Sequence, residues 1–273
     1  MKSPGKYLGA LGCIVLASMV VASLARNSRW VGGAVLAAMA AYTLVVSEVL
    51  FKILSVVRQH RKESAASYRQ LEALQSLYSQ ISFRFPVPPM RNAAASPDFA
   101  NLLVANVFER DPMVVVEASS GLSSIFMGYA LEAKKSGGKV YSLEHHEGYA
   151  AISRKLLKAH RLEQYVEVIY APLKPYSIDG VEYLWYDISV IEHVSQIDLL
   201  VIDGPPANVG PLARFPAVPL LGERLKKNGA VIMDDGIRSD EIKIAELWQS
   251  AAYDLQQAHS PSTEKGCFVL EKS

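Results

Sequence analysis

Residues 113–124 read MVVVEASSGLSS, and residues 139–144, after one intervening helical pattern, read KVYSLE and end at Glu144. An apolar β-branched run, an acid, a turn of small residues, a helix and a second strand that ends in an acid form the pattern of a nucleotide-binding βαβ unit. The pattern predicts an enzyme domain that binds an adenosine-containing cofactor.

Apolar runs alternate with helical patterns along the rest of this domain. A helix is expected at residues 98–110, and strands are expected at 113–118, 140–143, 166–170, 197–202 and 230–233. Strands that alternate with helices predict a parallel sheet covered on both faces. The last stretch, residues 253–259 and 266–271, predicts an antiparallel hairpin that completes the sheet.

Two uncharged apolar runs, residues 7–25 and 30–47, precede the domain. Each is long enough to cross the roughly 30 Å hydrocarbon core of a bilayer, and only residues 26–29 separate them, so they predict a transmembrane hairpin. Basic residues outside the hairpin outnumber those in its loop, which favours an inner (cytoplasmic) membrane protein with a cytoplasmic enzyme domain. The alternative is a signal peptide cleaved near residues 23–25, which would export the domain.

A second helical pattern, at residues 56–82, follows the apolar runs and ends before the FPVPPM segment at 85–90. This juxtamembrane helix could pack on the domain or pair with a second copy in a homodimer. The expected organisation is a transmembrane hairpin over residues 1–54, a juxtamembrane helix and linker over 55–90, and an enzyme domain over 91–273.

Composition argues against several other classes of protein. The 273 residues carry a formal net charge of +1, so no strong positive field marks a nucleic-acid-binding protein. The two cysteines, Cys13 and Cys267, show neither a disulfide framework nor metal-ligand spacing.

Three aspartates follow two neighbouring strands. IDLLVIDGPP places Asp203 after one strand, and GAVIMDDG places Asp234 and Asp235 after the next. The carboxyl ends of adjacent parallel strands meet at the edge where open α/β sheets bind ligands. Acids gathered there repel one another unless a proton or a cation neutralises them, and oxygen ligands suit Mg²⁺. The pattern predicts a magnesium site, with simple turn capping by Asp203 and Asp234 as the alternative.

The turn after Glu117 keeps only Gly121 of the G-x-G-x-x-G fingerprint of dinucleotide enzymes. Its order of acid, small turn, glycine and two serines resembles motif one of class I S-adenosylmethionine-dependent methyltransferases. Together with NAAASPDF, WYD, RFPAVPLL and GAVIMDDGIRSDE, it is similar to the methyltransferase 24 type of these enzymes and, more distantly, to metal-dependent O-methyltransferases. The resemblance covers about residues 91–272 and implies an α/β, Rossmann-like domain with a mostly parallel seven-stranded sheet.

The resemblance also implies roles for matching residues. Asp203, Asp234 and Asp235 would hold Mg²⁺, and Asp203 would also take the proton of the acceptor hydroxyl. Glu144 would accept both ribose hydroxyls, because a carboxylate has two acceptor oxygens. The full set of expected contacts to S-adenosyl-L-methionine is Glu117, Ser119, Gly121, Ser123, Glu144, His145 and Ala171.

The sequence departs from the family pattern at three places in that site. Ser119 stands where a glycine is usual, and Pro206 stands where catechol-type enzymes have a lysine. The segment after the third strand, YAPLKPY at residues 170–176, lacks the acid that often holds the adenine amine. These departures leave two alternatives open beside an active enzyme. One is a catalytically inactive scaffold that binds the cofactor at the membrane. The other is a nucleotide-sugar or NAD enzyme on the same fold, against which the incomplete glycine fingerprint argues.

The expected function is O-methylation of a glycan, a lipid-linked sugar or a small hydroxyl acceptor by a membrane-anchored, Mg²⁺-assisted methyltransferase. Arg214 and Arg238 flank the expected mouth of the site, where they could hold an anionic acceptor or form structural ion pairs, such as Arg238 with Glu241. Trp185 and Tyr186 could line the acceptor pocket or pack the loop that carries them.

Overall fold

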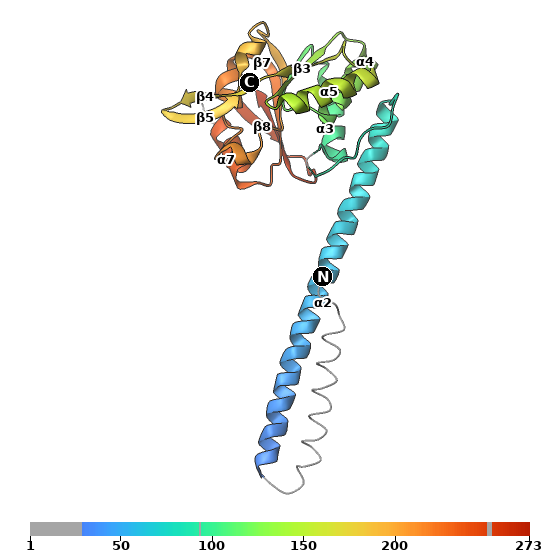
Figure 1. The fold of residues 1–273 in the computed structure, drawn as a ribbon, viewed down its shortest axis with the longest axis vertical. Helices are drawn as coiled ribbons and strands as arrows, with labels where there is room; N and C mark the ends of the chain where they lie inside the picture. Colours follow the sequence, from blue (N-terminus) through green and yellow to red (C-terminus); the bar gives the residue numbers. More distant parts are fainter. Residues whose placement is uncertain (1–28, 93, 250–252) are drawn as a thin grey trace. The chain divides into compact units, whose positions relative to one another are not determined.

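The computed structural model describes residues 29–92, 94–249 and 253–273, and it divides the chain into two compact units, Met1–Ala66 and Ser67–Ser273. Helix α2, Arg29–Gln80, runs across this division (Figure 1). Its stretch Gly32–Gln80 is long enough to cross a membrane and contains an 18-residue window with a mean hydropathy of 2.0, so it is a candidate membrane span by length and composition. The expected first span, residues 7–25, lies outside the described residues, so the transmembrane hairpin stays a prediction.

The second unit is built around a seven-stranded sheet of order β3-β2-β1-β6-β7-β9-β8. The pairs from β3 to β7 are all parallel, whereas β9 runs antiparallel to both β7 and β8. The mostly parallel sheet expected from the sequence is therefore confirmed. The strands are β1 Val114–Ala118, β2 Lys139–Glu144, β3 Val166–Tyr170, β6 Ile197–Ile202, β7 Leu225–Asp234, β8 Leu255–His259 and β9 Cys267–Lys272.

The terminal hairpin expected from the sequence is also confirmed, and its second strand enters the sheet between β7 and β8. Val269 and Leu270 of β9 are buried and pair with Ile232 and Val231 of β7, so the hairpin completes the hydrophobic layers on both faces.

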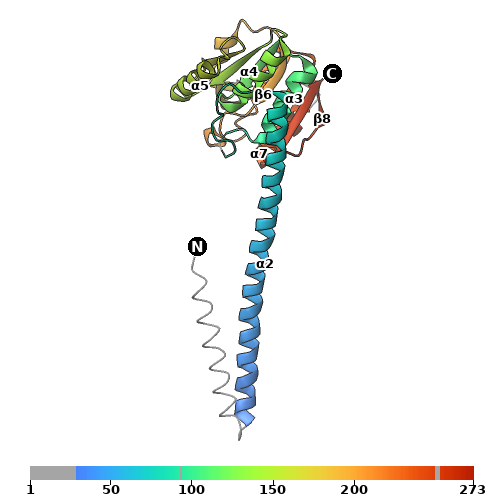
Figure 2. The ribbon, with the colours of Figure 1, turned by 90° about the vertical axis from the view of Figure 1, so that its right-hand side faces the viewer.

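Helices cover both faces of the sheet, and the side chains of each strand alternate between them. Val115 belongs to the core cluster under α3, α4 and α5, whereas Val116 belongs to the cluster under α6 and α7. Figures 1 and 2 show α3, α4 and α5 gathered on one side of the sheet. The helices of this unit are α3 Pro97–Arg110, α4 Leu122–Lys134, α5 Glu147–His160, α6 Ala217–Leu221 and α7 Ser239–Trp248.

The last turns of α2 pack on the sheet unit. Leu77 is fully buried within the core cluster under α3 and α4. The Gln70 side-chain amide donates to Asp98 Oδ2 at 2.6 Å, and the Gln80 amide donates to Asn101 Oδ1 at 2.7 Å. Of the two packing partners considered for the juxtamembrane helix, the structure shows the domain itself.

A second, two-stranded sheet was not anticipated. Strands β4, Leu173–Ile178, and β5, Val181–Tyr186, pair antiparallel and project beside the main sheet (Figure 1). Asp179 and Gly180 form the two-residue turn with φ values of 52° and 78°. An Asp-Gly pair between strands is a hairpin signal, so the sequence did contain the clue.

Candidate active site

Two neighbouring hollows open at the carboxyl edge of the parallel strands. The motif-one hollow, of about 360 Å³, is lined by Ser119–Ser123 and residues of α5, and the aspartate hollow, of about 460 Å³, is lined by Asp203, Asp235 and Arg214 among others. They adjoin, because both are lined by the side chains of Ser119, Glu144, Tyr149 and Asp203. A group bound in one hollow would therefore meet a group bound in the other.

The backbone of the turn between β1 and α4 forms the floor of the motif-one hollow. Gly121 has a φ of 143° and Ser119 has a φ of 139°, both in a region that L side chains rarely adopt. Ser119 therefore holds the conformation in which glycine is usual, although it carries a side chain. The Gly121 amide donates to Ser124 Oγ at 3.1 Å, which fixes the start of α4.

Glu117 lies beneath this turn and lines neither hollow. Its Oε2 accepts hydrogen bonds from Ser124 Oγ and Ser142 Oγ, each at 2.5 Å. Complete burial raises the pKa of the Glu117 carboxyl, and the serine hydrogen bonds oppose that shift. Glu117 is thus placed to position the turn, whereas Ser119, Gly121 and Ser123 line the motif-one hollow directly.

Glu144 stands at the end of β2, between the two hollows. Its Oε2 accepts from Ser120 Oγ at 3.0 Å and its Oε1 accepts from the His146 amide at 2.9 Å, which orients the carboxylate. Each oxygen keeps capacity for a further hydrogen bond. His145 lines the aspartate hollow, while Ala171 is fully buried and lines neither hollow.

Asp203, Asp234 and Asp235 come together as the sequence predicts, with one oxygen of each within 4.8 Å of the others. Burial raises the pKa of Asp203 to about 6, against the opposing effect of the Arg214 charge. Burial and then the Asp203 charge raise the pKa of Asp234 to about 7. Both Asp234 oxygens lack a hydrogen-bond partner among the described residues, and Lys265 Nζ lies 3.8 Å from Oδ2.

Arg214, which the sequence placed at the mouth of the site, lies at the centre of this acidic group and forms ion pairs with it, the second of the two roles considered for it. Its residue is only 3% exposed. Nη2 donates to Asp235 Oδ2 at 2.7 Å and lies 3.4 Å from Asp203 Oδ1, while Nη1 donates to the Asp234 carbonyl at 2.9 Å. Nε lies 3.6 Å from Glu241 Oε1. No local spacing links Arg214 to these acids, which lie 11 to 27 positions away, so only the fold brings them together.

The other residues at the mouth are more peripheral. Arg238 Nη1 lies 3.0 Å from Asp235 and 3.7 Å from Glu241, which confirms the structural ion pair considered for it. Tyr186 is almost fully buried but lines the aspartate hollow, as expected, whereas Trp185 packs in the core. Burial raises the pKa of the Tyr186 phenol well above its usual value, so it stays protonated.

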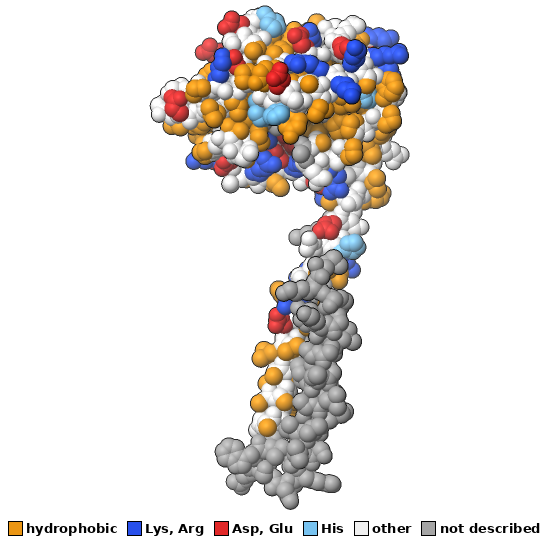
Figure 3. Space-filling view, in the orientation of Figure 1, with side chains coloured by type: hydrophobic (Ala, Val, Ile, Leu, Met, Phe, Trp, Pro, Cys, Tyr) orange, Lys and Arg blue, Asp and Glu red, His pale blue; other side chains and the backbone are white. Residues whose placement is uncertain are grey.

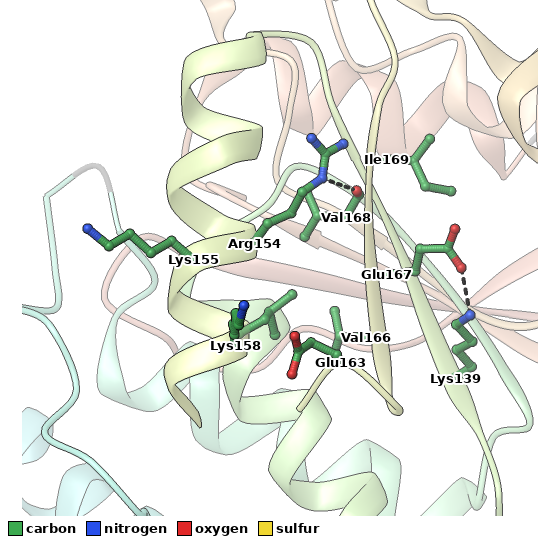
Figure 4. Close-up of a pocket in the computed structure, with 10 residues that line it drawn as sticks. Lys139, Arg154, Lys155, Lys158, Glu163, Val166, Glu167, Val168 and Ile169 are labelled. Atoms are coloured by element: carbon green, nitrogen blue, oxygen red, sulfur yellow. Dashed lines mark hydrogen bonds and ion pairs between the residues drawn. The ribbon is translucent and has the colours of Figure 1, made fainter. Parts of the chain in front are cut away.

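A larger hollow, of about 700 Å³, lies away from this edge, between α5 and β3 (Figure 4). Arg154 Nε donates to the Val168 carbonyl at 2.9 Å, and Lys139 Nζ donates to Glu167 at 2.6 Å. Two of its charged side chains therefore already hold structural partners, and none of the expected cofactor or metal residues lines it. The two hollows at the strand ends are therefore the candidate active site.

The sheet order, the motif-one turn and the acids at the strand ends define a class I methyltransferase fold. Residues 117–236 match a family model described as a methyltransferase domain, of the methyltransferase 24 type. Over this stretch the chain resembles S-adenosylmethionine-dependent methyltransferases, and its fold is shared with solved O-methyltransferases. The match favours a methyltransferase over the alternative of a nucleotide-sugar or NAD enzyme.

Solved structures share the fold at low sequence identity. An O-methyltransferase from Bacillus cereus in complex with SAH is 17% identical with a TM-score of 0.50, over 75% of this chain and 90% of that chain. The SAH-bound methyltransferase PaMTH1 from Podospora anserina is 13% identical with a TM-score of 0.51, over 79% of this chain and 95% of that chain. Among curated proteins, none matches the sequence.

Proposed function

We propose that this protein transfers the methyl group of S-adenosylmethionine to a hydroxyl acceptor. The observation that carries the proposal is the shared wall of the two hollows, where Ser119, Glu144 and Asp203 face both spaces. The cofactor would lie in the motif-one hollow and the acceptor in the aspartate hollow. The structural neighbours in complex with SAH and the match to a methyltransferase domain support the choice of cofactor.

The residues present can perform this reaction. Bound S-adenosylmethionine supplies a methyl group on a sulfonium, which leaves as a neutral thioether when the acceptor oxygen takes the methyl. Glu144 would hold the ribose hydroxyls and so orient the methyl group toward the aspartate hollow. Asp203 would accept the hydroxyl proton as the new O–C bond forms, and its pKa of about 6 suits a base that works near neutral pH.

Mg²⁺ would be the expected helper, held by Asp203, Asp234 and Asp235. Their oxygens lie close together, yet the Arg214 guanidinium already contacts two of the three carboxylates. The residues therefore do not fit a resident Mg²⁺, and the proposed reaction uses no step through a metal.

The membrane part of the proposal rests on α2. Many apolar side chains in the N-terminal half of α2 are exposed, among them Leu36, Leu44 and Phe51. Figure 3 shows hydrophobic side chains in orange along this part of the helix. Exposed apolar residues along a long helix suit a lipid environment. We propose an inner-membrane anchor with a cytoplasmic enzyme domain, no nucleic-acid partner, and a glycan, lipid-linked sugar or small hydroxyl acceptor. The proposal includes a homodimer that pairs through the juxtamembrane part of α2.

Calorimetry on the full chain in detergent tests the cofactor assignment. S-adenosylmethionine should bind the wild-type protein, and Glu144→Gln should weaken binding by roughly tenfold or more, because a hydrogen bond to a charged group contributes about 1.5–3 kcal/mol. Glu147→Gln, on α5 and outside both hollows, is the matched control and should bind normally. Absence of binding to the wild-type chain would refute the proposal. Binding without transfer to any hydroxyl acceptor would favour the inactive scaffold.

A further inference from the structure

Arg214 is clamped from several directions at the centre of the aspartate hollow. Asp234 and Asp235 at the end of β7 hold both of its terminal nitrogens, through a carbonyl at 2.9 Å and a carboxylate at 2.7 Å. Glu241 of α7 faces Nε from 3.6 Å. An arginine held by a strand end and a helix has little freedom to swing away.

The same guanidinium edge also reaches the acid proposed as the base. Arg214 Nη2 lies 3.4 Å from Asp203 Oδ1 and 2.7 Å from Asp235 Oδ2, so it bridges two of the carboxylates that would otherwise ligate a cation. The side chains of Arg214 and Asp235 are 4% and 5% exposed. Buried charges of opposite sign stabilise each other, and removal of either leaves an uncompensated charge.

We propose that Arg214 is the built-in cation of this site and neutralises the three aspartates in place of the Mg²⁺ that the sequence predicted there. This inference rests on the proposed function, because it assigns the site's positive charge for the same methyl transfer. A guanidinium stays charged at all physiological pH values and needs no loading from solution. It keeps the acids paired, positions Asp203 beside the acceptor hydroxyl, and presents positive charge where the acceptor oxygen loses its proton.

The inference predicts how the full chain responds to metal. Wild-type protein in detergent should bind S-adenosylmethionine with the same affinity, within twofold, in Mg²⁺ and in a chelator. It should also show no Mn²⁺ site by electron paramagnetic resonance at micromolar ion concentrations. Arg214→Met removes the charge and should create an Mn²⁺ site, because three clustered carboxylates then lack their partner. Adding Asp235→Asn to Arg214→Met should abolish that new site.

Two further variants distinguish the loss of positive charge at Arg214 from a change in side-chain shape and from a general loss of stability. Arg214→Lys keeps a positive charge and should remain without an Mn²⁺ site, even if it is less stable. Arg224→Gln is the matched control, since Arg224 donates only to the carbonyls of Ile191 and Val194 away from the aspartates. It should behave as the wild type does. Circular dichroism shows which variants are folded.

Two results would overturn the inference. One is a wild-type Mn²⁺ site that Asp235→Asn removes. The other is Arg214→Met that is folded and still binds no Mn²⁺. Failure of S-adenosylmethionine to bind any variant would instead count against the proposed function, because the Mn²⁺ measurement requires neither cofactor nor acceptor.

Discussion

Ser119→Gly should stabilise the protein. Ser119 has a φ of 139°, and a non-glycine residue held in such a region carries strain on the order of 1–3 kcal/mol. Its backbone amide still donates to the Leu143 carbonyl at 3.0 Å in the variant, and its hydroxyl makes no hydrogen bond to the described residues. Glycine also makes the unfolded chain more flexible, which lowers the free energy of unfolding by roughly 0.5–1 kcal/mol. The net gain in the free energy of unfolding should therefore lie between about 0 and 2.5 kcal/mol, with a central value of about 1 kcal/mol.

Urea unfolding of the full chain in detergent, followed by the fluorescence of the buried Trp185 and Trp248, measures this gain. The unfolding midpoint should rise with an unchanged slope, because the surface exposed on unfolding is the same. Ser120→Gly is the control, because Ser120 Oγ bonds Glu144 at 3.0 Å and Ser153 at 2.9 Å. It should lose about 1–3 kcal/mol through those bonds. If Ser119→Gly unfolds at or below the wild-type midpoint, the backbone strain assigned to this turn is wrong.

Three further predictions address the rest of the structure. Gly204→Ala should lower the free energy of unfolding by about 1–3 kcal/mol through overpacking, since the new Cβ would lie 2.3 Å from Tyr186 Oη. In a double-mutant cycle measured by urea unfolding, Tyr186→Phe should restore part of that loss. Leu77→Ala should cost about 2–5 kcal/mol in urea unfolding, whereas Leu71→Ala, which is 64% exposed, should change stability by less than about 0.5 kcal/mol. The buried acids Asp203 and Asp234, with pKa values raised to about 6 and 7 from the usual 3.8, bind protons more readily in the folded state, so their contribution to stability is full at low pH and is lost as the pH rises through 6–7. Urea midpoints at pH 5 and pH 8 should therefore converge in Asp234→Asn, and an unchanged difference between them would contradict the assignment.

Much of the fold could be predicted because the strands are long apolar runs with clear ends. Strands β3 and β6 begin and end at the expected residues, and the terminal hairpin follows its turn residues. The number of strands came from the family resemblance rather than from periodicity, and the order of the strands was not predicted. The β4–β5 hairpin was missed because Lys174, Pro175 and Glu182 interrupt the apolar pattern of its two strands. Its Asp-Gly turn is a stronger signal than the strands themselves.

The site was harder to predict than the fold. The three aspartates could be placed together, because each directly follows a strand of a parallel sheet and those strand ends share one edge. The position of Arg214 could not be predicted in the same way, because Arg214 lies in the turn between Gly210 and α6 and does not directly follow a strand. Ion pairs between residues far apart in the sequence depend on tertiary packing, so the spacing of these residues along the chain does not predict them.

The burial of Leu77 has a consequence for any soluble form of this protein. The last turns of α2 supply part of the hydrophobic core, although the sequence assigns them to a separate juxtamembrane segment. Proteolysis before Ser67 would release a domain with its core complete, whereas cleavage within residues 85–90 would strip away Leu77 and Ile81 and expose apolar surface. The site of cleavage, more than its occurrence, therefore decides whether a released domain stays folded or aggregates.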